Sequence, residues 1–385
     1  MLTGSGFFCD WKPKPLVEAS SRKRNPTPSK LNMIPRLATH LLLRPEDVPP
    51  SRPDWEVIGT FNPGVIRHGK ETVLMVRVAE RPREQRPGFT ALPRWSPDER
   101  YVVDWLKNEE LELLDPRVVR RRADGLVRLT FVSHLRVARS RDGRRIDRIS
   151  GPVFMPEHPF EEFGVEDPRI TLIDGRYYVT YVAVSRHGAA TALASTADFE
   201  TFERHGIIFC PENKDVVLFS ERIGGDYVAL HRPRGGTEFT KPEIWIARSP
   251  DLIHWGAHEP LFGGAGDWET GRVGAGAPPL PLPEGWLEIY HGNRRPEGPG
   301  EVGAYCGAAM LLASDDPSRI LKVTRQPVLE PQLEFELEGF VAKVVFPTAV
   351  IEEDDRLLVY YGASDKYSAM AEIPRAALVE ALSDV

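Results

Sequence analysis

The sequence predicts an all-β fold, specifically a five-bladed β-propeller. Its 385 residues include 32 glycines and 35 prolines, and short alternating apolar runs bounded by Gly, Pro or Asp are far more frequent than helical patterns. A polar corner, a strand hairpin and a small turn also recur along the chain. Many short strands in a repeat of this kind are typical of propeller blades.

Five corners mark the starts of the predicted blades. Each precedes or opens an apolar run and carries a polar residue or a proline: NPGVI (62–66), EDPRIT (166–171), NKDVVLF (213–219), GAGAPPL (274–280) and FPTAVI (346–351). The innermost strand of a propeller blade lines the central channel. We therefore expect the five corners to open into one funnel.

Hairpin runs accompany the corners. They are LVRLTFVS (126–133), GRYYVTYVAV (175–184), GDYVALHRP (225–233), GWLEIYHG (285–292) and DRLLVYYGASD (355–365). Four of them lead to turns in which we expect a serine and then an aspartate two residues later, and these serines are Ser140, Ser195, Ser249 and Ser314. A pair of β-sandwiches is the alternative fold, but it gives no reason for a repeated turn.

Three segments do not fit the repeat. Residues 1–32 are rich in Pro, Ser, Lys and Arg and are predicted to lack fixed structure. Residues 81–112 are predicted to be an insertion in the first blade, and residues 374–383 to form a short C-terminal helix. The remaining pattern predicts a single propeller domain over residues 33–385.

Composition excludes several classes of partner. The formal net charge is −7 and no basic block stands out, which argues against nucleic acid or an anionic membrane. Cys9, Cys210 and Cys306 lack metal-ligand spacing and suit a reducing compartment. No run is long and apolar enough to span a membrane, and we read no signal peptide. These features predict a cytoplasmic protein without a metal, and they leave its oligomeric state open.

Asp167 is the first candidate for a reactive group. It follows Glu166 and precedes Pro168 at the second corner. An aspartate before a proline is often a simple turn residue. If the corners face one funnel, however, Asp167 meets Lys214 and Arg272. Both interpretations stay open on the residues alone.

A series of motifs then resembles a known family. These motifs are GVEDPRIT, IDGRYYVTY, ENKDVVLF, ALHRP, IWIARSPDLIHWG, RVGAGAPP, IYHG, VVFPTAV and VYYGASD. In this order they are similar to glycoside hydrolase family 130, which contains β-mannoside phosphorylases and some β-mannosidases on a five-bladed propeller. The resemblance runs from about Asn62 to Asp365. The insertion at 81–112 and a second DPR at 115–117 depart from the family pattern.

The resemblance implies that Asp167 is the catalytic acid. Inverting cleavage of a glycosidic bond requires a proton on the leaving oxygen, and in this family the proton travels through a hydroxyl of the bound sugar. We expect like-charge repulsion from Glu166 to raise the pKa of Asp167. Asp115 carries the same DPR letters in a basic context and is interpreted as structural.

The nucleophile distinguishes a phosphorylase from a hydrolase. Phosphate needs cations to hold it, whereas water needs a second carboxylate as a base. The resemblance implies phosphate binding by Lys214, by Arg232 with His231 beside it, and by Arg272. Under the alternative hydrolase interpretation, Glu269 is the candidate base.

The remaining family positions are expected to bind sugar. They are Asn62, Arg77, Glu166, Asp215, Tyr290, His291, Tyr305 and Asp365. Hydroxyls need such donors and acceptors, and aromatic faces cover the C–H patches of a sugar. Tyr290 alternates with apolar residues, so the alternative for it is a place in a blade core.

The resulting prediction is an inverting glycoside phosphorylase. It would cleave a β-mannoside with inorganic phosphate, a co-substrate rather than a cofactor, to give α-mannose 1-phosphate. The first alternative is a β-mannosidase that uses water with Asp167 and a glutamate. The second is a non-catalytic propeller that binds carbohydrate or serves as a scaffold.

Overall fold

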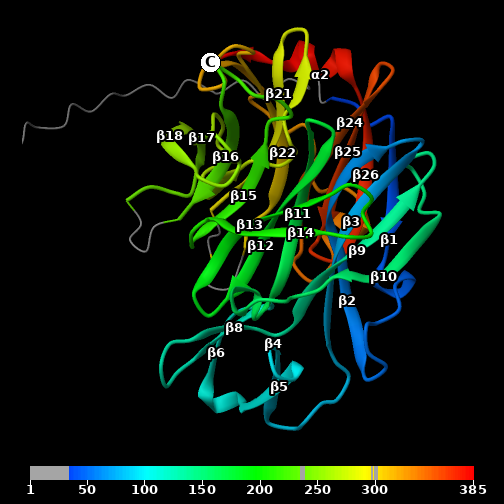
Figure 1. Ribbon diagram of the computed structural model, residues 1–385, viewed down its shortest axis with the longest axis vertical. Coiled ribbons are helices and arrows are strands. Elements are labelled where there is room, and N and C mark those ends of the chain that lie inside the picture. Colours follow the sequence, from blue (N-terminus) through cyan, green and yellow to red (C-terminus); the bar gives the residue numbers. More distant parts are fainter. Residues whose placement is uncertain (1–33, 235–238, 296–297, 299–301) are drawn as a thin grey trace, which may run out of the picture. The chain divides into compact units, whose positions relative to one another are not determined.

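The computed structural model describes residues 34–234, 239–295, 298 and 302–385. The segment predicted to lack fixed structure, 1–32, lies outside these residues. The predicted all-β class is confirmed, because the described chain consists mainly of β-strands (Figure 1). Its α-helices are short, α1 (Glu334–Leu337) and α2 (Arg375–Ala381), and α2 falls in the segment predicted as a C-terminal helix. None of the described helices has the length and apolar character needed to cross a membrane.

The largest sheet has eight strands, which form two antiparallel groups of four. One group contains β2 (Trp55–His68), β3 (Glu71–Pro82), β9 (Val132–Ser140) and β10 (Arg148–Phe154). The other contains β11 (Gly164–Ile173), β12 (Arg176–Ser185), β13 (Gly188–Thr196) and β14 (Glu203–Phe209). A single parallel pair, Gly164 with Ser133, joins them. Gly164 has φ +121°, and a Cβ there would lie 2.6 Å from the Ser133 nitrogen, so the junction requires glycine.

Three further sheets follow in chain order. The third group contains β15 (Asn213–Leu218), β16 (Tyr227–Pro233), β17 (Ile244–Ser249) and β18 (Gly256–Phe262). The fourth contains β19 (Arg272–Gly274), β20 (Leu280–Leu282), β21 (Gly285–Asn293), β22 (Tyr305–Leu312), β23 (Ile320–Val323) and β27 (Ser383–Asp384). The fifth contains β24 (Val345–Glu353), β25 (Arg356–Ala363), β26 (Tyr367–Pro374) and β1 (Ala38–Leu43).

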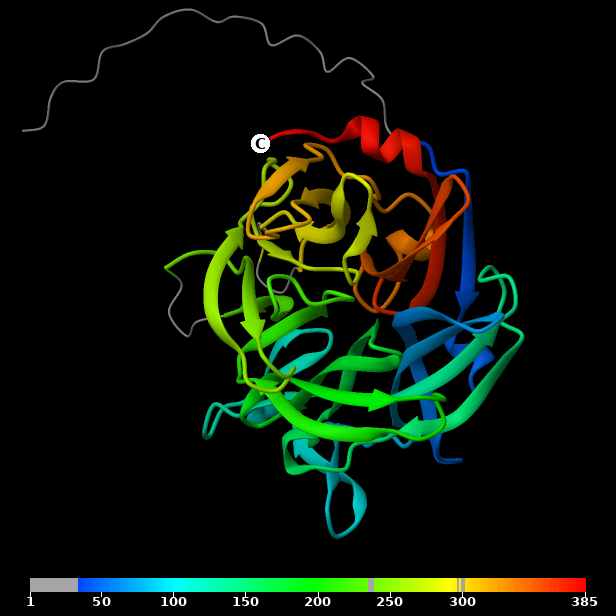
Figure 2. The same ribbon diagram turned by 45° about the horizontal axis from the view of Figure 1, so that its top comes forward.

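Neighbouring groups pack against one another through shared apolar clusters. Strand β2 contacts β11, β11 contacts β15, β16 contacts β19, β21 contacts β24, and β24 contacts β2. One cluster combines Val65 of β2 and Leu74 of β3 with Tyr360 of β25 and Met370 of β26. The strands of such a cluster therefore bury side chains between neighbouring groups. Figure 2 shows the five groups following one another in the order of the sequence colours.

The inserted segment forms two small sheets between β3 and β9. One pairs β4 (Phe89–Ser96) with β5 (Arg100–Lys107), and the other contains β6 (Leu111–Asp115), β7 (Val118–Arg121) and β8 (Val127–Leu129). They form the cyan part at the bottom of Figure 1. The segment therefore extends beyond the predicted 81–112. The run 126–133, expected to be a hairpin of the repeat, is divided between β8 and the start of β9.

The repeated turns are held by aspartates. Asp142, Asp198, Asp251 and Asp316 each accept at least one backbone N–H from the residues just after them. Ser140 and Ser249 stand two positions before the aspartate, as expected, and Thr196 has that position in the second turn. The prediction of Ser195 was wrong by one residue, because Ser195 instead bonds to Arg176 and His205.

Short 3-10 helices occur at Pro45–Asp47 (η1), Asn108–Glu110 (η2) and Pro159–Glu161 (η3).

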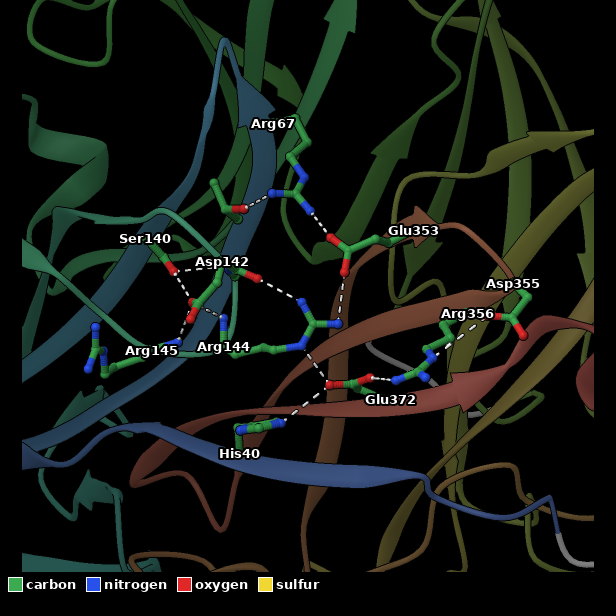
Figure 3. Close-up of polar contacts among 12 residues, drawn as sticks. His40, Arg67, Ser140, Asp142, Arg144, Arg145, Glu353, Asp355, Arg356 and Glu372 are labelled. Atoms are coloured by element: carbon green, nitrogen blue, oxygen red, sulfur yellow. Dashed lines mark hydrogen bonds and ion pairs between the residues drawn. The ribbon is translucent and has the colours of Figure 1, made fainter.

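An ion-pair network ties the fifth group to the first (Figure 3). Arg144, in the connection from β9 to β10, donates to Glu372 of β26 at 2.7 Å and pairs with Glu353 of β24 at 2.8 Å. Arg67 of β2 also pairs with Glu353, and Arg356 of β25 with Glu372 at 2.8 Å. Glu372 is buried, and hydrogen bonds from Arg144 together with Arg356 lower its pKa to about 2 although burial opposes this.

Candidate active site

A cavity of about 220 Å³ collects side chains from all five groups and from the insertion. Its polar lining residues are Asn62, Arg77, Arg117, Glu166, Asp167, Glu212, Asn213, Lys214, Asp215, Arg232, Arg234, Arg272, Tyr305 and Asp365. Residues from opposite ends of the sequence therefore meet here, as the corner pattern predicted. In the described part of the chain, no cluster of three or more His, Cys, Asp or Glu side chains could hold a metal ion.

Three corners share an uncommon backbone conformation. Asn62, Asp167 and Asp215 have φ values of +50°, +48° and +57°. Each lies where the strand register shifts, on β2, β11 and β15 respectively. Asn and Asp adopt the left-handed region more readily than other residues with a Cβ. The corners therefore require short polar side chains, and the bulges direct three of them to one cavity.

Asp167 is held by the first group of strands. Its Oδ1 accepts hydrogen bonds from Asn62 Nδ2 at 2.8 Å and from Arg77 Nη1 at 2.9 Å. Arg77 Nη2 also donates to Glu166 Oε1 at 2.6 Å, so one guanidinium bridges both carboxylates. Arg169 donates to the Asp167 carbonyl at 3.0 Å and to the Gly276 carbonyl at 2.5 Å. Asn62 and Arg77 belong to the first group, and Gly276 lies between β19 and β20 of the fourth. These bonds therefore fix the Asp167 corner of the second group relative to both.

The expected rise of the Asp167 pKa was wrong. Burial acts to raise this pKa, but the charges of Arg77 and Arg169 and the hydrogen bond from Asn62 outweigh it, so the pKa lies below its usual value. Burial instead raises the pKa of the neighbouring Glu166. Repulsion from Glu166 does not raise the pKa of Asp167, because Arg77 bonds to both carboxylates.

Three predicted cations also line the cavity. Arg232 Nε donates to Asp215 Oδ2 at 2.6 Å, and Asp215 also accepts from His291 at 3.2 Å. Arg272 Nη1 contacts the Tyr305 hydroxyl at 3.3 Å. Among the described residues, no carboxylate lies within 4.0 Å of the Lys214 ammonium or the Arg272 guanidinium. Lys214 and Arg272 can therefore accept an anionic ligand without first losing an ion pair.

Four other predicted residues do not line this cavity. Glu269 is fully buried, accepts the backbone N–H of Gly266 at 2.9 Å and receives the Tyr290 hydroxyl. Neither residue can reach a substrate, so the interpretation of Glu269 as a base was wrong, and Tyr290 fills a core. His291 is also fully buried, and it contacts Asp215 without lining the cavity itself.

His231 bonds to Asn213 and His258 and lines a separate cavity. Its position beside Arg232 in the sequence was misleading, because successive residues of a strand face opposite sides.

Comparison with known proteins places the chain in a family. The model of glycoside hydrolase family 130, described as beta-1,4-mannooligosaccharide phosphorylase, matches residues 104–384. This chain belongs to glycoside hydrolase family 130. It is 41% identical over 347 residues to a β-1,2-mannobiose phosphorylase of Listeria innocua, which covers 86% of this chain and 93% of that protein.

A further relative and a solved structure agree with this match. A 1,2-β-oligomannan phosphorylase of a Thermoanaerobacter species is 37% identical over 245 residues, covering 63% of this chain and 78% of that protein. A structure of the β-1,2-mannobiose phosphorylase of Listeria innocua in complex with β-1,2-mannobiose matches with a TM-score of 0.83 and 38% identity. It covers 89% of this chain and 98% of that one.

Arg117 is a cavity residue of this family 130 chain that was not predicted from the sequence. Arg117 lines the cavity and donates to Asp365 Oδ2 at 2.8 Å. Asp115 accepts from the same guanidinium at 3.2 Å. The repeated DPR letters were a signal for this position, but the surrounding basic residues made it resemble an exposed corner. Glu212, Asn213, Arg234 and Phe131 were missed for lack of any comparable signal.

Proposed function

We propose that this chain is an inverting phosphorylase that cleaves β-1,2-linked mannosides with inorganic phosphate. The observation that carries the proposal is the shared cavity: Asp167 lies in it with Lys214 and Arg272, two cations that have no carboxylate partner among the described residues. The β-1,2 linkage is supported by the relatives of highest identity described above. The products would be α-mannose 1-phosphate and a sugar shortened by one residue.

The proposed reaction needs two positioned partners. Phosphate, held by Lys214, Arg232 and Arg272, attacks the anomeric carbon from the face opposite the leaving oxygen. The glycosidic C–O bond breaks, and the leaving oxygen takes a proton that originates at Asp167 and passes through a sugar hydroxyl. A phosphate anion in the cavity brings negative charge near Asp167, which favours its protonated form. Phosphate binding thus helps prepare the acid.

The hydrolase alternative has less support. Its candidate base, Glu269, is buried and engaged with the Gly266 amide and the Tyr290 hydroxyl. A phosphorylase needs no such base, because phosphate is already an anionic nucleophile. The scaffold alternative gives no role to Lys214 and Arg272, which share the cavity with Asp167 and have no carboxylate partner among the described residues.

The deciding experiment is phosphate dependence. The protein is incubated with β-1,2-mannobiose, and in parallel with β-1,4-mannobiose, with and without inorganic phosphate. We expect α-mannose 1-phosphate and mannose from the β-1,2 disaccharide, and only when phosphate is present. Equal cleavage without phosphate would establish a hydrolase, and release from the β-1,4 disaccharide alone would overturn the linkage.

We also propose that the five groups are the blades of a five-bladed propeller. The support is that each group contacts the next in chain order and that β24 of the last contacts β2 of the first. A charged phosphorylated product is retained by a membrane, which favours the predicted cytoplasmic location.

A further inference from the structure

The inserted segment contributes one wall of the active-site cavity. Arg117, Val118 and Leu129 come from its second small sheet, and Phe131 follows directly. The cations assigned to phosphate, in contrast, come from the third and fourth groups of strands. The insertion therefore faces the cavity from a separate part of the fold.

Arg117 is held rigidly at this wall. Its Nη1 donates to Asp365 Oδ2 at 2.8 Å, and Nε and Nη2 donate to the two Asp115 oxygens at 3.2 Å each. The Arg117 backbone N–H donates to Asp115 at 2.8 Å, and its carbonyl accepts from Thr130 at 3.0 Å. These bonds use only part of the five N–H donors of the guanidinium. The others are available to a ligand in the cavity.

Arg117 is less suited to phosphate than the other cavity cations. It already pairs with two carboxylates, Asp115 and Asp365, which offset its charge toward an anion. Lys214 and Arg272 lack such carboxylates among the described residues. The described cavity residues therefore differ in character: Lys214 and Arg272 offer uncompensated positive charge, whereas Arg117 with Asp115 and Asp365 offers mixed donors and acceptors.

Mixed donors and acceptors suit hydroxyl groups. Carboxylate oxygens accept from sugar hydroxyls, and an oriented guanidinium donates to them. Leu129, Val118 and the buried ring of Phe131 add apolar surface beside these groups, which can cover the C–H face of a sugar.

We propose that Arg117 binds the sugar and not the phosphate, so that the inserted segment is part of the substrate-binding site. The proposal rests on the phosphorylase function proposed above. It assigns different residues of the cavity to the two substrates. Arg117 acts together with Asp365, whose carboxylate it orients.

Steady-state kinetics of Arg117→Met with β-1,2-mannobiose and phosphate tests this assignment. We expect the KM for the disaccharide to rise by about 10–100-fold, the loss of one charge-assisted hydrogen bond, while the KM for phosphate stays within about twofold. Lys214→Met should show the opposite pattern. Arg120→Met is the matched control, because Arg120 lies on the same small sheet, exposed and paired with Glu112.

A binding measurement separates this proposal from the proposed function. The thermal shift caused by β-1,2-mannobiose, without phosphate and without turnover, should be lost in Arg117→Met while the shift caused by phosphate persists. Wild-type protein that binds the disaccharide but makes no product would contradict the phosphorylase function alone. A rise in the phosphate KM, or an unchanged disaccharide KM and thermal shift, overturns the role of Arg117. Arg117→Lys retains the charge and serves if the methionine variant fails to fold.

Discussion

At the scale of single residues, each corner position requires both an uncommon backbone conformation and a particular polar side chain. Asp167 must adopt φ +48° and must also present a carboxylate between Asn62 and Arg77. Few residues with a Cβ tolerate this backbone, and of Asn and Asp, which do, only Asp can supply the proposed proton. Asn62 and Asp215 adopt the same left-handed backbone conformation. Their side chains differ in role, because Asn62 donates to Asp167 whereas Asp215 accepts from Arg232.

Replacing Asp167 by Asn separates these two demands. Asparagine tolerates the left-handed conformation, so the fold should persist, while loss of the acid should lower kcat by about 10²–10⁴-fold. Binding of β-1,2-mannobiose, measured by thermal shift, should remain. Asp174→Asn is the matched control, because Asp174 is exposed, has φ +50° and lies outside the cavity. A kcat near that of the control would remove Asp167 from the mechanism.

The sequence predicted those site residues that stand at strand corners. Asp167, Lys214 and Arg272 could be found because corners of successive repeats converge in space. Tyr290 could not be placed correctly, since both faces of β21 are buried between neighbouring groups and alternation then carries no information about which face meets solvent. Arg117 was missed because its approach to Asp365, 248 residues later, depends on tertiary structure.

At the scale of elements, the connection between β9 and β10 depends on one glycine. Gly143 has φ +73°, and a Cβ there would lie 2.5 Å from the hydroxyl of Tyr360 on β25. That hydroxyl donates to the Gly143 carbonyl at 3.0 Å. The turn of the first group is thus fitted closely against the fifth group. The repeated turn was visible in the sequence, whereas this contact with a distant strand was not.

A pair of glycine variants measures this fit. Gly143→Ala should lower the free energy of unfolding by about 2–4 kcal/mol, since it combines a left-handed alanine with a steric clash. Gly69→Ala should cost only about 1 kcal/mol, because its φ is +61° but nothing lies within 4 Å of the added Cβ. Urea unfolding of both variants gives the comparison. Equal losses would show that the contact with Tyr360 adds nothing.

At the scale of the whole molecule, the network of Figure 3 connects the first group with the last. Glu372 is its centre, with Arg144 and Arg356 as partners and His40 at 3.4 Å. Its pKa of about 2 lies below the model-compound value of 4.5. Glu372 therefore stabilises the folded state fully above about pH 5, and this contribution is lost as the pH falls toward 2.

The variant Glu372→Gln should remove this pH dependence. At pH 7 we expect it to lower the free energy of unfolding by about 2–4 kcal/mol, because two arginines lose a buried carboxylate. Between pH 5 and about 2 its melting temperature should fall less than that of the wild type. Glu200→Gln, at an exposed position of a turn, is the control. Parallel melting curves over this range would contradict the assigned role of Glu372.

The pairing of β1 with β26 also has a consequence for synthesis on the ribosome. Residues 38–43 leave the exit tunnel long before residues 367–374 are made. The earliest strand must therefore wait, with its edge exposed, until residues 367–374 have also emerged. Emergence of β26 thus sets the earliest moment at which the fifth sheet can be completed.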